Sequence, residues 1–145
     1  MKAPEFWRHD GALARLLAPA AWAYRIGAGL NRRRVAPTRV GAPVICVGNL
    51  VAGGAGKTPT ALAIAGLLRH RGRRPHFLTR GYGGRLVGPV RVDTARHGVA
   101  EVGDEALLLA ARAPTWLARD RVAGATAAVA AGADVIVMEI GRAHV

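Results

Sequence analysis

The residues best suited to chemistry in this sequence are Lys57 and Thr58, which follow a glycine-rich turn. Glycines let successive backbone N–H groups converge on an anion. A lysine placed there can reach the β- and γ-phosphates of a nucleotide, and a threonine hydroxyl can coordinate Mg²⁺. We therefore predict a phosphate-binding segment that consists of Val51, Ala52, Gly53, Gly54, Ala55, Gly56, Lys57 and Thr58.

Secondary-structure elements on both sides must position this turn. The apolar run 44–47 predicts a short buried strand before it, and residues 57–71 predict a helix after it, with Leu62, Ile64, Ala65 and Leu68 facing inward. A helix that begins at Lys57 would direct its N-terminus toward the anion. Val51 stands where the strict phosphate-loop pattern has glycine, so a plain strand-to-helix turn remains an alternative.

Acidic residues occur at two places that could serve the same chemistry. Asp104 and Glu105 open a predicted helix, and Glu139 ends the strongly apolar strand 133–138. An acid at the end of such a strand, downstream of a phosphate loop, is typical of a magnesium ligand in nucleotide enzymes. The alternative for Asp104 and Glu105 is capping alone, because acids stabilise helix N-termini.

The remaining segments alternate between strands and helices. Residues 75–79 and 115–118 predict strands, each followed by an arginine, Arg80 or Arg119, and an alanine-rich helix runs to about residue 131. Tyr82 lies in the glycine-rich tip after Arg80. This alternation predicts an α/β fold with a mostly parallel sheet between helices, whose ligands bind at the carboxyl ends of the strands.

Composition narrows the classes of function. The chain has 145 residues, which suits one domain with a core, and a formal net charge of +12. This charge either favours anionic partners or reflects an arginine-biased composition. Aromatic residues make up only 5%, which disfavours a nucleic-acid-binding module. Cys46 is the lone cysteine, so we predict an inert core residue and no disulfide or metal framework.

Residues 1–34 differ from the rest. They are mostly apolar, carry Trp22 and Tyr24, and end in three arginines. Arg15, Pro19 and Arg25 interrupt the apolar stretch, which disfavours a membrane-spanning helix. We predict an amphipathic helix in the membrane interface, with a helix packed on the domain as the alternative.

Together these segments resemble the tetraacyldisaccharide 4′-kinases, the lipid A 4′-kinases. The resemblance covers residues 43 to about 138, and the N-terminal segment looks like that family's membrane anchor. Its motifs occur in order: Pro43-Val-Ile-Cys-Val-Gly-Asn-Leu50, Gly53-Gly-Ala-Gly-Lys-Thr-Pro59, Arg80-Gly-Tyr-Gly-Gly84, Val102-Gly-Asp-Glu105, Arg119-Asp-Arg121 and Ala133-Asp-Val-Ile-Val137.

The resemblance implies a phosphate-loop NTPase-like three-layer α/β/α fold and transfer of the ATP γ-phosphoryl group to the 4′-hydroxyl of tetraacyldisaccharide 1-phosphate. ATP and Mg²⁺ are the implied cofactors. The implied setting is peripheral, at the cytoplasmic face of the inner membrane, with no nucleic acid and no obligate protein partner. In the implied roles, Lys57, Asp104 and Glu105 are catalytic, with Asp104 the base. Thr58 and Glu139 bind the metal, and Arg80, Tyr82 and Arg119 contact the substrate.

The sequence departs from the family after residue 138. The family's strand ends in Asp-Asp-Gly, whereas this chain continues Glu139-Ile-Gly-Arg-Ala-His-Val145. Residues 140–145 match the translation of a common sequencing adapter, so we interpret them as a non-native tail. The adapter then completes the codon of Glu139, whose first base is native, and Glu139 stands where the family has its first metal-binding Asp. Residues 35–139 would form an incomplete N-terminal lobe, inactive without the second lobe that the family has.

Two other classes of function stay open from the residues alone. One is another phosphate-loop ATPase, of the membrane-partitioning type, although the extra lysine of those loops is absent at Val51 and Ala52. The other is a basic binding fragment without catalytic activity.

Overall fold

The structure, a computed structural model, describes residues 12–34, 37–48 and 56–139. It divides into two compact units, Met1–Thr38 and Arg39–Val145. The predictions for residues 51–55 and for the tail 140–145 lie outside the described residues.

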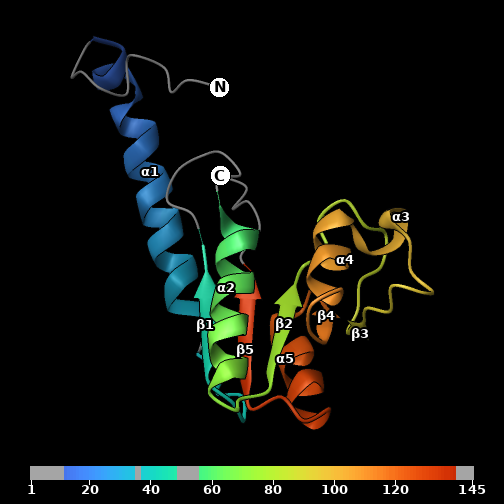
Figure 1. The fold of residues 1–145 in the computed structure, drawn as a ribbon. Coiled ribbons are helices and arrows are strands. Elements are labelled where there is room, and N and C mark those ends of the chain that lie inside the picture. The colour runs from blue at the N-terminus through green and yellow to red at the C-terminus, as the bar shows by residue number, and fades with distance from the viewer. Residues whose placement is uncertain (1–11, 35–36, 49–55, 140–145) are drawn as a thin grey trace. The chain divides into compact units, whose positions relative to one another are not determined.

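The described residues of the first unit form the helix α1, Ala12–Arg34 (Figure 1), which includes Pro19. Among the side chains described in α1, several large apolar and aromatic ones are exposed: Leu16, Leu17, Trp22, Tyr24 and Ile26. No helix in the described part of the chain combines the length and the apolar character needed to cross a membrane.

The second unit is built on a five-stranded sheet with the order β1-β5-β2-β4-β3. Strands β1, β5, β2 and β4 run parallel, and β3 pairs antiparallel with β4 at one edge. The strands are β1 (Val44–Val47), β2 (Pro75–Thr79), β3 (Val90–Arg91), β4 (Thr115–Leu117) and β5 (Val135–Glu139). The helices are α2 (Lys57–His70), α3 (Val99–Val102), α4 (Asp104–Ala110) and α5 (Arg121–Ala130).

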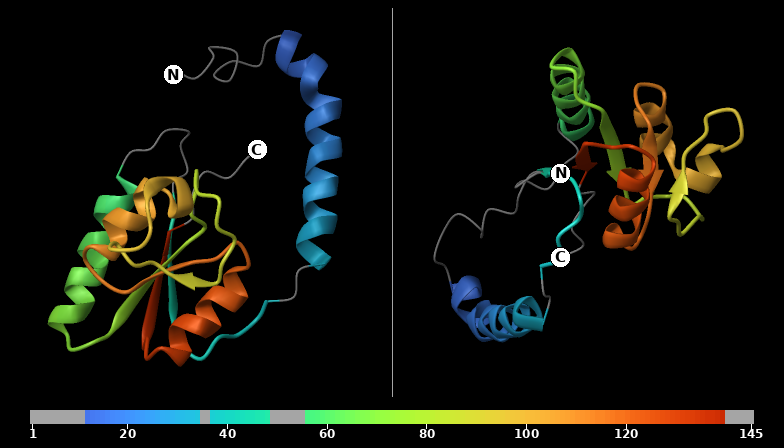
Figure 2. Two further views of the ribbon diagram at one scale, coloured as in Figure 1. Left: turned by 90° about the vertical axis from the view of Figure 1, so that its right-hand side faces the viewer. Right: turned by 90° about the horizontal axis from the view of Figure 1, so that it is seen from below.

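Helices cover both faces of the sheet (Figure 2). Phe77 packs on one face with Ala61 and Ala65 of α2 and Leu109 of α4. Its neighbour Leu78 packs on the other face with Ala125 and Ala128 of α5. Successive side chains of a strand point to opposite faces, so one short strand serves both cores. The predicted mixed α/β fold with a mostly parallel sheet between helices is confirmed.

The prediction that the strand before the turn is buried is wrong for part of β1. Only Val47 is buried, and both Val44 and Cys46 are exposed. Within the described residues β1 pairs with β5 alone and forms an edge of the sheet. An apolar run shows that a strand is compatible with burial, but not whether a neighbour covers it. Cys46 is therefore not the core residue that the sequence predicted.

Candidate functional site

The site begins where α2 begins. Gly56 precedes the helix with a φ of 84°, a left-handed conformation that a side chain would strain. Its carbonyl accepts hydrogen bonds from the Thr60 backbone N–H at 3.0 Å and from the Thr60 hydroxyl at 2.7 Å. This turn fixes Lys57 and Thr58 in the first turn of the helix, as the sequence predicted.

Thr58 brings two distant acids together. Its hydroxyl lies 3.1 Å from Oε1 of Glu139 and 3.3 Å from Oε1 of Glu105. The three side chains come from the start of α2, the first turn of α4 and the end of β5. A hydroxyl has one proton, so it can donate to only one of the two carboxylates at a time. Two acids therefore share a single neutral donor.

Glu139 is the most perturbed group of this cluster. It is 2% exposed, and its Oε2 has no hydrogen-bond partner among the described residues. The pKa of Glu139 is raised to about 7, first by burial and then by the hydrogen bond with Glu105 and the charge of that residue. The Thr58 hydrogen bond and the charge of Lys57 act on this pKa in the opposite direction. An unpartnered oxygen beside a second carboxylate leaves negative charge in excess.

This arrangement fits a hard divalent cation. Carboxylate and hydroxyl oxygens are the ligands that Mg²⁺ prefers, and Mg²⁺ keeps several waters. The described residues contain no group of three or more histidine, cysteine or acidic side chains that could hold a metal. The protein ligands of a cation here would be Thr58, Glu105 and Glu139, with its remaining positions open to water or to phosphate oxygens.

Asp104 lies beside this cluster but outside its hydrogen bonds. It is exposed, and its Oδ1 accepts the backbone N–H of Glu105 at 2.8 Å. The contact is local and fixes the carboxylate at the start of α4. Asp104 thus faces solvent one residue away from a cluster acid.

Arg80, Tyr82 and Arg119 lie at the same end of the sheet, and all three are exposed. Arg80 follows β2 and Arg119 closely follows the neighbouring strand β4, whose Leu117 pairs with Thr79. The Arg119 backbone N–H donates to the carbonyl of Val87 at 2.9 Å. Within the described part of the chain, no hydrogen bond or ion pair joins either arginine to Thr58. The structure therefore groups them by topology rather than by direct contact.

Glycine packing ties the Tyr82 loop to α4, a feature that the sequence motifs did not reveal. Gly103 has a φ of 84°, and a Cβ there would meet the Tyr82 carbonyl oxygen at 2.4 Å. A Cβ on Gly84 would meet the Glu101 carbonyl oxygen at 2.6 Å. The backbone of this loop thus lies directly against the residues that lead into Asp104. The sequence signals were the glycines of Arg80-Gly-Tyr-Gly-Gly84 and Val102-Gly-Asp-Glu105, which do not show that the two segments pack together.

Comparisons with known proteins show which family this chain resembles. The sequence matches the family model described as tetraacyldisaccharide-1-P 4′-kinase over residues 13–144. A tetraacyldisaccharide 4′-kinase from Methylobacterium sp. (strain 4-46) is 61% identical over 144 residues, which cover 97% of this chain and 43% of the relative. One from Rhodospirillum rubrum is 56% identical over 145 residues, with 98% and 43% covered.

A solved structure shows the same fold. LpxK from Aquifex aeolicus, in complex with ATP, matches with a TM-score of 0.67 and 27% identity, over 87% of this chain and 43% of that chain. The present chain thus spans less than half the length of the relatives that it matches.

Proposed function

The chain belongs to the tetraacyldisaccharide-1-P 4′-kinase family, and from that premise we propose that it is the nucleotide- and cation-binding part of such a kinase. The whole enzyme would transfer the γ-phosphoryl group of ATP to the 4′-hydroxyl of tetraacyldisaccharide 1-phosphate. The observation that carries this proposal is the convergence of Thr58, Glu105 and Glu139 at the carboxyl end of a parallel sheet. Ligands of open α/β sheets bind at that end.

The nucleotide would lie on the segment 51–58. Lys57 follows the glycine-rich turn, and its charge already acts on the Glu139 carboxylate. The backbone N–H groups of the segment and the ammonium of Lys57 would hold the β- and γ-phosphates. Thr58, Glu105 and Glu139 would hold Mg²⁺, which when bound neutralises charge that develops on the phosphoryl oxygens.

Asp104 is suited to the role of general base. It is exposed, so an acceptor hydroxyl can approach it, and its backbone contact with Glu105 holds it beside the cation ligands. A base must lie within hydrogen-bond reach of the proton that it accepts. Arg80, Tyr82 and Arg119 would then contact the phosphorylated disaccharide. This role is supported by the position of Arg80 after β2 and of Arg119 after β4, and by the packing of the Tyr82 backbone against Gly103, next to Asp104.

The test uses the full-length protein that contains this chain. Phosphoryl transfer from ATP to tetraacyldisaccharide 1-phosphate is measured for Thr58→Ala and for Thr60→Ala. We expect Thr58→Ala to lower kcat by about 10² or more, since a transition-state ligand is lost. Thr60 is the matched control, because its hydroxyl contacts only the Gly56 carbonyl in the described structure. Equal rates for the two variants would refute the proposed function.

We also propose that residues 1–34 attach the protein peripherally to the cytoplasmic face of the inner membrane, as a lipid substrate requires. The exposed Leu16, Trp22 and Tyr24 of α1, interspersed with Arg15 and Arg25, support a position in the interface. Deletion of residues 1–34 should release the protein from liposomes that contain anionic lipid. Binding that is unchanged by the deletion would reject this role for the segment.

A further inference from the structure

The opposite end of the sheet holds a buried histidine beside two arginines that have no acidic partner of their own among the described residues. His76 of β2 is 7% exposed, and its Nδ1 accepts the indole N–H of Trp116 at 3.3 Å. A nitrogen that accepts a hydrogen bond carries no proton, so the proton of the neutral ring lies on Nε2. Within the described residues, no acceptor contacts this Nε2–H group.

The two arginines are linked to His76 by the sheet and by the chain. Arg91 of β3 pairs directly with Trp116 of β4, the residue that contacts the imidazole. Arg74 lies two residues before His76, immediately ahead of β2, and its side chain is exposed. Burial lowers the pKa of His76, and the charges of Arg91 and then Arg74 lower it further, as expected if both guanidinium groups are near the ring.

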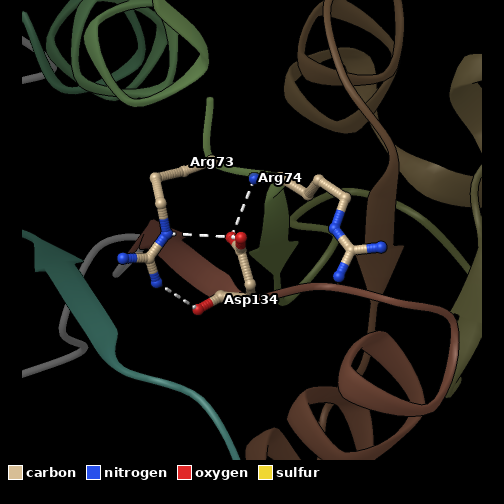
Figure 3. Close-up of polar contacts among 3 residues, drawn as sticks. All are labelled: Arg73, Arg74 and Asp134. Atoms are coloured by element: carbon tan, nitrogen blue, oxygen red, sulfur yellow. Dashed lines mark hydrogen bonds and ion pairs between the residues drawn. The ribbon is translucent and has the colours of Figure 1, made fainter. Parts of the chain in front are cut away.

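The neighbouring acid is already occupied. Asp134 forms an ion pair with Nε of Arg73 at 3.2 Å and accepts the backbone N–H of Arg74 at 2.8 Å. Figure 3 shows that the guanidinium of Arg74 points away from Asp134. Both the Arg74 and Arg91 side chains are exposed and lack a described ion pair. Positive charge is therefore in excess here, and further exposed arginines lie nearby in the sequence of this end: Arg69 in the last turn of α2, and Arg71 and Arg112 in loops.

We propose that Arg74, Arg91 and the Nε2–H group of His76 form a binding site for a phosphate-type oxyanion. Guanidinium groups present planar donors that match phosphate oxygens, and the imidazole adds a further N–H donor. The site lies at the amino-terminal end of the sheet, remote from Thr58, which sits where β5 ends at Glu139. It does not depend on the proposed kinase function. The phosphate can be a free phosphate compound or the headgroup of an anionic lipid.

The test follows the ring signals of His76 by NMR while inorganic phosphate is added to the 145-residue chain. We expect saturable shifts of the His76 signals, with affinity about tenfold weaker in Arg74→Ala and in Arg91→Ala, since each removes charged hydrogen bonds. Arg112→Ala removes the same charge from the same end of the molecule and should change affinity less than about twofold. Lys57→Ala should leave the His76 response intact, which separates this site from the phosphate loop.

Two results would overturn the proposal: a His76 signal that does not respond to phosphate, or an equal loss of affinity in Arg112→Ala, which would indicate general charge attraction.

A second experiment uses vesicles of phosphatidylcholine with and without phosphatidylglycerol. A His76 response to phosphatidylglycerol that Arg74→Ala weakens would assign the site to a lipid headgroup. A response to phosphate without one to vesicles would assign it to free phosphate compounds.

Discussion

The two ends of β5 carry two acids in opposite situations. Asp134 precedes the strand and meets the Arg73 guanidinium and the Arg74 backbone N–H, while its carbonyl accepts Nη2 of Arg73 at 3.0 Å. Hydrogen bonds and arginine charges lower the pKa of Asp134, although desolvation acts against them. Glu139 ends the strand with one shared hydroxyl and an unpartnered oxygen, and its pKa is raised to about 7.

Asp134 therefore stabilises the fold, whereas Glu139 is suited to bind a ligand. Donors within the protein pair with the Asp134 carboxylate, so this acid needs no further cation or hydrogen-bond donor. A buried carboxylate without enough donors is destabilising unless a cation or a proton compensates it. Such a cost is tolerated where it serves function. The comparison therefore predicts that changes at the Glu139 end alter chemistry and relieve a destabilising charge, whereas changes at the Asp134 end lower stability and leave the chemistry unchanged.

The largest expected effect concerns Asp104. In the full-length protein, Asp104→Ala should lower kcat by about 10²–10⁴, the range typical of a lost general base, with ATP affinity retained. Asp134→Ala should leave kcat nearly unchanged, because its carboxylate binds only the α2–β2 loop. Initial rates and nucleotide titrations on both variants provide the measurement. Near-normal turnover of Asp104→Ala would remove the base assignment.

The next-largest expected effect is that of Glu139→Gln on the stability of the fold. The native carboxyl binds its proton more tightly than the unfolded one, whose pKa is about 4.5. Unfolding therefore releases a proton between pH 4.5 and 7, and the free energy of unfolding falls as pH rises through that window. Glutamine removes this contribution.

Urea unfolding in metal-free buffer at a series of pH values checks the prediction. The wild-type chain should lose stability between pH 4.5 and 7 relative to Glu139→Gln, and Mg²⁺ at about pH 8 should stabilise the wild type more than the variant. Parallel pH curves for the two proteins would show that Glu139 is ionised in the native state without penalty.

Much of the fold could be predicted because its signals are local. The start of α2 at Lys57, the buried strand β2 and the start of α4 at Asp104 follow from apolar runs, glycines and capping acids. The exposure of Cys46 could not be predicted, because it depends on what lies beside β1. The same strand pattern fits an edge and an interior position.

The site was predictable as a set of residue types but not as a geometry. Lys57, Thr58 and Glu139 were each marked by motif position. That Glu105, rather than Asp104, shares the Thr58 hydroxyl depends on how α4 is rotated over the sheet. The His76–Trp116 contact joins residues 40 positions apart and has no sequence signal.

Gly103→Ala tests whether backbone packing sets the site. A Cβ on residue 103 would clash with the Tyr82 carbonyl oxygen, and the backbone φ of 84° at this position adds strain. We therefore expect a loss of about 1–3 kcal/mol in stability and a lower kcat. Gly72, in the loop between α2 and β2, is the matched control. Its φ is 73°, but nothing lies within 4 Å of the point that a Cβ would occupy. Gly72→Ala should cost only the left-handed conformation, about 1 kcal/mol, with kcat intact. Equal effects on kcat would dismiss the packing argument.

The smallest expected effect is that of Asp134→Asn, and its sign is opposite to that of Glu139→Gln. The pKa of Asp134 is lower in the native state than its ordinary value of 3.8. Its stabilising contribution is therefore fully present above that value and is lost as pH falls through the lower native pKa. The wild type should exceed Asp134→Asn in Tm at about pH 7, and the gap should close in acid and shrink with salt, because the Arg73 pair is partly exposed. A gap that persists at about pH 2 would mean that Asp134 acts through its hydrogen-bond geometry rather than its charge, and the contrast between the two ends of β5 would then lie in packing rather than in electrostatics.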